Sequence, residues 1–405
     1  MKLKYTFIDL FAGCGGLSEG FYKQGFQPLA HVENDHYSCQ SLRMRLKHYN
    51  FSEKNTEIIE KDIKSKNIIS YLKRGLKGKK IDLLLGGPPC QSFSSLGRAK
   101  DDQSMKNDPR NYLFENYEKI LNNLKPKIFV FENVTGLLTA RFNKEKVIDI
   151  IKERLGKKYN ILNDVNKIVL NSCEYGVPQI RKRVFLIGIR KDIKYEISKI
   201  FNNILKTHYT PLSLKQEKKN KKKFITVRDA IFDLPRIKPG EGKTIIKFNS
   251  NFNNDFLKKI RKKNENFLYD HVSRAHNNFD RKRFREMSKN KWTYEELLER
   301  KPSLNHKKER VFKNSYVVQF WDKPARTIIS HLYKDGNQFI HPDYKQERTL
   351  TVREAARLQS FPDNFHFAGP RTEQYKQIGN AVPPLMSEKI AISIKKALTE
   401  INKSV

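Results

Sequence analysis

Short apolar runs recur through the first 190 residues, and each ends in a glycine, proline or charged turn. They lie at residues 5–10, 26–32, 81–85, 127–131 and 184–189, with helix-like stretches such as 113–124 and 146–155 between them. Strands that alternate with helices are typical of a parallel sheet covered by helices on both faces. We therefore expect an α/β domain over residues 1–190, with a doubly wound, mostly parallel sheet.

The pattern changes near residue 191. The lysine run at 215–223 predicts a solvated loop, and the chain stays basic and irregular to about residue 345, with basic clusters at 261–263, 281–285 and 307–310. Regular patterning returns at 349–361, where Thr349 is a candidate helix cap, and at 390–398, which predicts a final amphipathic helix. We expect domain divisions at residues 190, 345 and 374, with 375–405 returning to the first domain.

The net charge of +36 points to a polyanionic partner. A surplus this large makes nucleic acid the leading candidate, although abundant Lys, Asn and Ile also fit the codon bias of an AT-rich genome. The chain has no apolar run long enough for a membrane helix and no signal-peptide layout, so we expect a cytoplasmic protein. No CxxC pair occurs, which argues against a zinc site or a disulfide framework among Cys14, Cys39, Cys90 and Cys173.

The first motif is the glycine-rich segment Asp-Leu-Phe-Ala-Gly-Cys-Gly-Gly at 9–16. Glycines between a strand and a helix let the backbone approach a ligand closely, but the spacing is not the dinucleotide fingerprint GxGxxG. Glu33 follows Gly13 by 20 residues and is placed to accept hydrogen bonds from ribose hydroxyls. Asp62 is a candidate contact for an adenine amino group. The alternative is a tight turn with a purely structural role.

The second motif is Gly-Gly-Pro-Pro-Cys-Gln-Ser-Phe-Ser at 86–94, directly beyond a predicted strand. Its two prolines stiffen a turn that presents Cys90 at the carboxyl end of a parallel strand, where ligands bind in open α/β sheets. A thiolate there is a strong nucleophile if its surroundings lower the pKa. A buried structural cysteine is the alternative.

Two further motifs carry polar groups at strand ends. Glu132, in Phe-Glu-Asn-Val at 131–134, matches the N3 and 4-amino groups of cytosine when it is protonated, and desolvation would favour that form. A helix-capping role is the alternative. Gln179, Arg181 and Arg183 alternate along an extended segment and so share one face, which suits phosphate or a base carbonyl. A solvated edge strand is the alternative.

The order of these motifs is more specific than any one of them. FAGCGG, PPCQSFS, ENV, QIRKR, REAARLQ and GNAV follow one another along the chain. This series closely resembles the C5-cytosine-specific DNA methyltransferase family of bacterial restriction–modification systems, over about residues 5–190 and 349–395. The intervening 191–325 matches no motif, as expected for that family's variable target-recognition region.

The resemblance implies the fold and the site. It implies a Rossmann-like, class I S-adenosylmethionine-dependent methyltransferase domain, a smaller irregular target-recognition domain at 191–345, and a hinge block on the recognition side at 346–374. It implies that S-adenosylmethionine is held by Phe11, Gly13, Gly15, Gly16, Glu33, Asp62, Pro88, Asn380 and Val382. The implied catalytic residues are the nucleophile Cys90 with Glu132, Gln179, Arg181 and Arg183, and the implied DNA contacts are Gln91, Ser94, Arg110 and Thr327.

The resemblance also implies the partners. Double-stranded DNA would be the substrate, with the cytosine flipped out of the helix because no side chain can reach it in the stack. We expect a monomer with no membrane partner, and a companion restriction endonuclease that acts on the same site. Three rivals remain: a transfer-RNA methyltransferase of the same fold, a catalytically silent DNA-binding protein, and a nicotinamide oxidoreductase. The long interval between motifs argues against the transfer-RNA enzyme, and the presence of Cys90 and Glu132 argues against a catalytically silent protein. The spacing of the glycines argues against the oxidoreductase.

Overall fold

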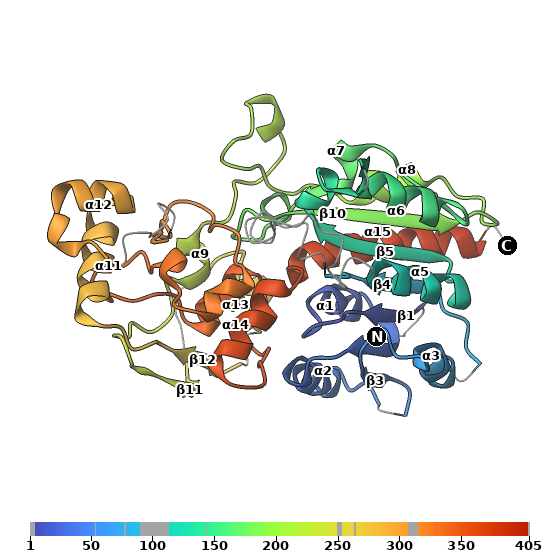
Figure 1. Cartoon of the computed structure of the whole chain (residues 1–405), viewed down its shortest axis with the longest axis horizontal. Helices are drawn as coiled ribbons and strands as arrows, with labels where there is room; N and C mark the ends of the chain where they lie inside the picture. The colour runs from blue at the N-terminus through green and yellow to red at the C-terminus, as the bar shows by residue number, and fades with distance from the viewer. Residues whose placement is uncertain are drawn as a thin grey trace. The chain divides into compact units, whose positions relative to one another are not determined.

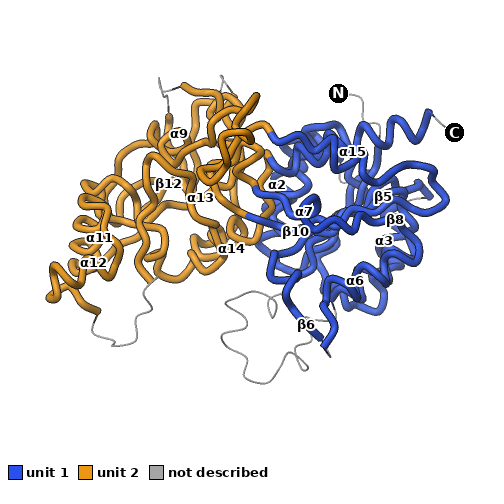
Figure 2. The backbone as a smooth tube through the Cα atoms, turned by 90° about the horizontal axis from the view of Figure 1, so that it is seen from above, with its two compact units in different colours: residues 1–171, 182–206, 386–405 blue, residues 172–181, 207–385 orange. Residues whose placement is uncertain are grey.

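The structure is a computed structural model that describes residues 5–52, 54–76, 78–89, 113–142, 144–248, 253–262, 265–306 and 315–403. Its contacts divide the chain into two compact units (Figure 2). Unit 1 comprises residues 1–171, 182–206 and 386–405, and unit 2 comprises residues 172–181 and 207–385. These divisions differ from the boundaries expected at 190, 345 and 374. Residues 346–385 join unit 2, and the return to unit 1 comes at Met386.

Unit 1 is built on one mixed sheet with the strand order β3-β2-β1-β4-β5-β10-β8, and β9 pairs with β10. Strands β1 to β5 run parallel where they pair, whereas β10 is antiparallel to β5, β8 and β9. The expected doubly wound, mostly parallel sheet is confirmed. The strands are β1 (Tyr5–Leu10), β2 (Phe26–Glu33), β3 (Glu57–Glu60), β4 (Leu83–Gly86), β5 (Ile128–Val134), β8 (Tyr159–Ile161), β9 (Val169–Asn171) and β10 (Lys182–Arg190).

The central strands are apolar without alternation because helices bury both faces of the sheet. In β5, residues 128–131 are all fully buried, and so are Leu83 to Leu85 in β4. Figures 1 and 2 show α6 and α15 on opposite faces of the sheet. The helices of this unit are α1 (Gly16–Lys23), α2 (His36–His48), α3 (Ile68–Leu76), α5 (Leu113–Leu124), α6 (Val147–Gly156), α7 (Val165–Ile168), α8 (Ile197–Asn203) and most of α15 (Pro384–Lys403).

The last helix closes unit 1 against the first segments of the chain. Ser387 lies against α1, where an added Cβ at Gly20 would meet backbone atoms of α15 at 2.3 Å. Near the far end of α15, the Thr399 hydroxyl bonds the Tyr5 hydroxyl at 2.9 Å, and in the middle of the helix the Ser393 hydroxyl donates to the carbonyl of Ile200 at 2.6 Å. No helix among the described residues has the length and apolar composition needed to cross a bilayer.

Unit 2 is more regular than its composition predicted. Its basic, irregular-looking sequence contains a two-stranded antiparallel sheet and several helices, because buried contacts order segments with little apolar periodicity. Its elements include α9 (Val227–Ile231), β11 (Gly242–Lys247), α10 (Leu257–Ile260), β12 (Phe267–Val272), α11 (Asn278–Asn290), α12 (Tyr294–Arg300), α13 (Val352–Leu358) and α14 (Arg371–Asn380). One core cluster joins α11 and α12 through Phe284, Met287 and Leu297.

The REAARLQ motif forms α13, and its arginines are buried structural groups. The helix begins at a Thr351 cap whose capping box includes Glu354, so the cap expected at Thr349 is wrong by two residues. Arg353 donates to three backbone carbonyls, and the guanidinium of Arg357 pairs with Asp363 at 2.7 Å. Buried charges persist only when they are paired or hydrogen-bonded, which explains the carboxylates around this motif.

Candidate active site

The glycine-rich turn joins β1 to α1 at the carboxyl end of the central parallel strands. Phe11, Gly13 and Gly15 all have positive φ, at 57°, 53° and 90°. Glycine adopts this conformation without strain, which accounts for the glycines at 13 and 15. The turn is held to β2 by the N–H of Ala12, which donates to the carbonyl of Val32 at 3.1 Å. Gly16 is buried at the start of α1.

Glu33 ends β2 and fixes the same turn. Its Oε2 accepts from the N–H of Gly13 at 2.8 Å, and its Oε1 accepts from the N–H groups of Asn34 and Asp35 at 2.8 and 2.9 Å. Burial raises the pKa of Glu33, and these hydrogen bonds work against that rise. The spacing of Gly13 and Glu33 in the sequence therefore corresponds to a direct contact. Asp62 is exposed beyond β3, where its Oδ1 accepts from the N–H of Lys64 at 2.8 Å.

A buried polar network beneath the turn was missed by the sequence interpretation. The Ser18 hydroxyl donates to Asp9 at 2.6 Å and lies 3.3 Å from Nε2 of His31, which also bonds the Tyr22 hydroxyl at 2.6 Å. Burial raises the pKa of Asp9 to about 7 and lowers that of His31 to about 3. The one signal in the sequence was a carboxylate inside the apolar run of β1.

Glu132 and Arg183 meet where β5 and β10 pair. Arg183 Nε lies 3.2 Å from Glu132 Oε1, and both side chains are largely buried, at 13% and 12% exposed. Burial lowers the pKa of Arg183, and the charge of Glu132 opposes that change. The antiparallel register sets Arg183 opposite Val134, close to Glu132 on the neighbouring strand.

The turn after β4 packs against the same strand end. The Asn133 amide donates to the carbonyl of Pro88 at 3.1 Å, and a Cβ added at Gly87 would lie 3.1 Å from Glu132 Oε2. Pro88 is buried. The structure thus brings the PPC turn and the ENV motif together at one end of the sheet. The predicted nucleophile Cys90 and the predicted DNA contacts Gln91, Ser94 and Arg110 lie outside the described residues.

Gln179 has a different environment from the one expected. It is fully buried in unit 2, where its Oε1 accepts from the N–H of Ile328 at 2.7 Å. Its amide nitrogen donates to the carbonyl of Leu358 at 3.1 Å and to the side chain of Gln359 at 2.8 Å. All these partners belong to unit 2.

Arg181 is likewise 1% exposed in unit 2. It donates to the carbonyls of Ile328 at 2.7 Å and Gly379 at 3.0 Å, while the Thr327 hydroxyl donates to the carbonyl of Ile180 at 2.7 Å. Gln179 and Arg181 thus both bond the backbone of Ile328, and the role of Gln179, Arg181 and Arg183 as one polar face toward phosphate or a base carbonyl stays a prediction. Gln179 and Arg181 bond to the backbone around them because buried polar groups require partners.

The last motif, GNAV, lies at the end of α14 in unit 2. Asn380 is exposed, and Val382 is 6% exposed in the segment that leads into α15. Close packing explains the glycine of this motif, because a Cβ at Gly379 would meet the backbone of Ser330 at 2.2 Å.

Comparison with known proteins agrees with this geometry. Residues 5–396 match the family described as C-5 cytosine-specific DNA methylase. The type II methyltransferase M.Bpa9945I of Bacillus paralicheniformis is 34% identical, across 96% of this chain and 98% of the relative. The type II methyltransferase M.DdeI of Desulfomicrobium norvegicum is 35% identical, across 98% of this chain and 89% of the relative.

Two solved structures share the fold. One, named as a DNA modification methyltransferase encoded within a prophage of E. coli, has a TM-score of 0.70 at 24% identity and covers 98% of this chain and 100% of its own. The Dnmt2 methyltransferase of S. pombe has a TM-score of 0.53 at 14% identity, with coverage of 97% and 99%. By its match over residues 5–396, the chain belongs to the C-5 cytosine-specific DNA methylase family and is an enzyme that methylates carbon 5 of cytosine in DNA.

Proposed function

We propose that this enzyme methylates a cytosine flipped out of a specific duplex sequence, through a covalent bond between the Cys90 sulfur and carbon 6 of the base. The observation that carries the proposal is the meeting of Glu132, Arg183 and the turn that precedes Cys90 at one end of the sheet. Duplex DNA is the substrate, and the cost of flipping is about a few kcal/mol.

S-adenosylmethionine, the methyl donor of the family, fits the glycine turn. A Cβ at Gly13 would have no heavy atom within 4 Å, so the turn leaves open space beside the carboxylate of Glu33. Glu33 would accept hydrogen bonds from the ribose hydroxyls and Asp62 would approach the adenine, with Phe11 packed against it. The proposed set of cofactor contacts is completed by Gly15, Gly16, Pro88, Asn380 and Val382. When bound, the sulfonium supplies an electrophilic methyl group.

The nucleophile is assigned to Cys90. Burial raises the pKa of Cys14, and it raises the pKa of Cys39 and of Cys173 to about 12, so these three thiols are poor sources of thiolate. Attack of the Cys90 thiolate on carbon 6 breaks the aromatic system and moves an electron pair toward carbon 5 and N3. Carbon 5 then takes the methyl group, and loss of its proton expels the thiolate and restores the ring.

Glu132 would stabilise the charge that develops at N3, and Arg183 would contact the cytosine O2. In the protein alone, the guanidinium of Arg183 lies 3.2 Å from the carboxylate of Glu132. A bound base that excludes water favours the protonated form, which pairs with N3. We reassign Gln179 and Arg181 as positioning residues that hold the segment leading into β10.

The target sequence would be chosen mainly by residues 191–345, with Thr327 at the DNA. Gln91, Ser94 and Arg110 are the other proposed DNA contacts. Because the relatives above are named type II methyltransferases, we propose that methylation protects host DNA from a companion restriction endonuclease. The enzyme would act as a monomer, since it meets one base at a time.

The test is transfer of labelled methyl from S-adenosylmethionine to mixed-sequence duplex DNA and, separately, to transfer RNA. Label recovered as 5-methylcytosine in DNA and lost in Cys90→Ser, with duplex binding retained, supports the proposal. Full turnover by that variant would rule out the covalent mechanism. Label found only in RNA would show that the substrate is transfer RNA and not DNA. Exchange of residues 191–345 with those of a relative should change the methylated site.

A further inference from the structure

One loop of unit 2 presents large apolar side chains to solvent. Leu212 is 90% exposed and Leu214 is 72% exposed, and the residues from Lys215 to Asn220 are exposed as well. In Figure 1 this loop is the yellow-green extension that stands away from the helices of its unit. Two leucines this exposed give the projection an apolar tip that a folded chain alone does not require.

Hydrogen bonds within the loop give the tip a defined conformation. At its base, the N–H of Tyr209 donates to the carbonyl of Lys222 at 2.9 Å, and the N–H of Lys222 donates back to Thr207 at 3.0 Å. Near the tip, the N–H of Leu214 donates to the carboxylate of Glu217 at 2.9 Å. A loop that is already ordered loses little conformational entropy when it binds.

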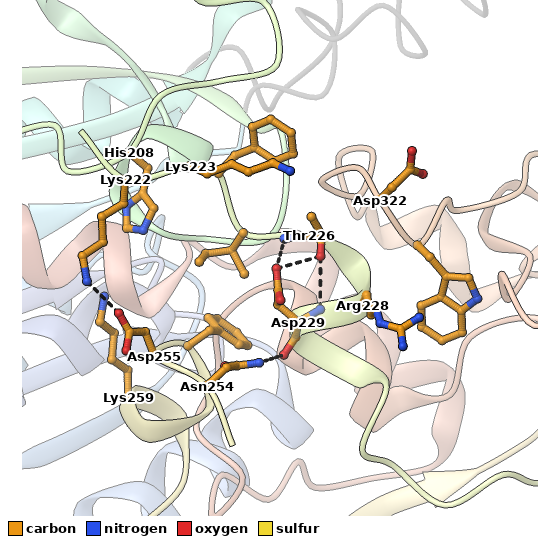
Figure 3. A pocket seen from close by; sticks show the side chains of 14 residues that line it. His208, Lys222, Lys223, Thr226, Arg228, Asp229, Asn254, Asp255, Lys259 and Asp322 are labelled. Atoms are coloured by element: carbon orange, nitrogen blue, oxygen red, sulfur yellow. Dashed lines mark hydrogen bonds and ion pairs between the residues drawn. The ribbon is translucent and has the colours of Figure 1, made fainter. Parts of the chain in front are cut away.

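The base of the loop is anchored at a pocket of about 570 Å³ in unit 2 (Figure 3). Lys222 forms an ion pair with Asp255 at 2.6 Å, which Figure 3 draws on the pocket wall. Next to it, the rings of Tyr209 and Phe224 meet edge to face at 6.0 Å. Both contacts fix the loop to the body of its unit and leave the tip outside.

The tip is strongly cationic. Lys215, Lys218 and Lys219 are exposed, Lys221 is half-buried beside them, and within the described part of the chain no carboxylate lies within 4.0 Å of these four ammonium groups. Glu217 is the one carboxylate between Lys215 and Lys221. An occupant must therefore supply several negative charges and an apolar surface together. Duplex DNA offers both, as phosphates and as the faces of its base pairs.

We propose that residues 207–222 form a DNA contact in which the lysines bind phosphates while Leu212 and Leu214 wedge against base pairs in a groove and bend the duplex. This inference rests on the proposed function, because it takes the enzyme's DNA substrate as the occupant. Apolar wedges of this kind partly unstack one base step and kink the helix. Phosphate contacts position the protein without reading sequence, so the loop would add affinity and bending on any flanking sequence.

The experiment separates the two parts of the interaction. Affinity for a duplex is measured between about 50 and 200 mM salt, and bending is measured by energy transfer between dyes on the duplex ends. The leucine variant carries Leu212→Ser and Leu214→Ser together, and the lysine variant carries Lys215→Gln, Lys218→Gln and Lys219→Gln together. The control is Leu205→Ser, because Leu205 is 67% exposed but lies outside the loop. The leucine pair should weaken binding about tenfold and abolish the bend without changing the salt slope. The lysine variant should reduce the slope by roughly 0.9 for each phosphate that the loop no longer neutralises.

Wild-type affinity and bending in the leucine variant would overturn the proposal, and so would equal losses in Leu205→Ser. A leucine variant that binds and bends DNA normally but no longer self-associates in sedimentation would assign the tip to a second copy instead. Methyl transfer to the same duplex is measured in parallel. Failure of the wild type to methylate it would count against the proposed function, whereas methylation with unchanged bending in the variant counts against the loop alone.

Discussion

Replacing Glu33 with glutamine tests the assignment of the glycine turn to the cofactor. The carboxylate now accepts from three backbone N–H groups, those of Gly13, Asn34 and Asp35. An amide has one acceptor oxygen, so in its better orientation it keeps the bonds from Asn34 and Asp35 and turns an N–H toward Gly13. The substitution therefore removes at least one hydrogen bond to a charged acceptor. It also places the amide N–H of the glutamine opposite the backbone N–H of Gly13, so that two donors face each other at the turn.

The magnitude follows from that loss. A hydrogen bond to a charged group contributes about 1.5–3 kcal/mol. If the ordered turn is needed only by the bound cofactor, this loss corresponds to a rise of roughly 10- to 100-fold in the Kd for S-adenosylmethionine. Affinity for duplex DNA measured without cofactor should not change.

The assay is titration calorimetry with S-adenosylmethionine, alongside anisotropy with a labelled duplex. Glu60→Gln is the matched control, since Glu60 pairs in register with Glu33 on β3 but its carboxylate bonds Arg43 and His36. A Kd for cofactor equal to that of the wild type, or an equal loss of cofactor and DNA binding, would refute the role given to Glu33.

Three further predictions concern the stability of unit 1 and are checked by urea unfolding. Burial raises the pKa of Asp9 from 3.8 to about 7, so the protonated carboxyl stabilises the fold fully below pH 3.8 and this stabilisation is lost as the pH rises through about 7. Asp9→Asn should therefore reduce the fall in the free energy of unfolding between these two pH values. An unchanged pH profile of stability would contradict this prediction. Arg45→Met leaves the fully buried carboxylate of Glu19 without its cationic partner and should lower the free energy of unfolding by about 3–5 kcal/mol. An unchanged free energy of unfolding would mean that the ion pair does not stabilise the fold. Gly20→Ala places a Cβ 2.3 Å from a backbone nitrogen of α15 and should cost about 1–3 kcal/mol or more, while Gly156→Ala, with open space around its Cβ, should cost far less.

The sheet of unit 1 could be predicted because its central strands are buried on both faces. Such strands appear as unbroken apolar runs, and the run at Tyr5–Leu10 and the helix at Leu113–Leu124 match the structure residue for residue. The short strands at Glu57–Glu60 and Tyr159–Ile161 were missed, because three or four residues at a sheet edge carry too little apolar pattern. The helix at Asn278–Asn290 was missed for a different reason. Its sequence is dominated by charge, and tertiary contacts through Phe284 and Met287 supply its stability.

The site was predictable wherever a motif followed a predicted strand. Glu33 does lie at the glycine turn, where it accepts from the N–H of Gly13, a contact that the sequence did not predict, and Glu132 lies beside Arg183. The role of Arg181 was not predictable, because alternation along an extended segment gives the direction of a side chain but not what covers it. Ile328 and Gly379, whose carbonyls accept from Arg181, are distant in sequence and give no local signal.

The packing of α15 against α1 also bears on how the protein is made. Gly20 and Tyr5 find their partners in a helix that is translated more than 360 positions after them. Unit 1 therefore cannot complete its fold until α15 has been translated, and the apolar faces of its earlier strands and helices stay uncovered while all of unit 2 is produced. A stalled or prematurely terminated chain would leave that surface uncovered, which makes nascent chains of this enzyme natural substrates for chaperones.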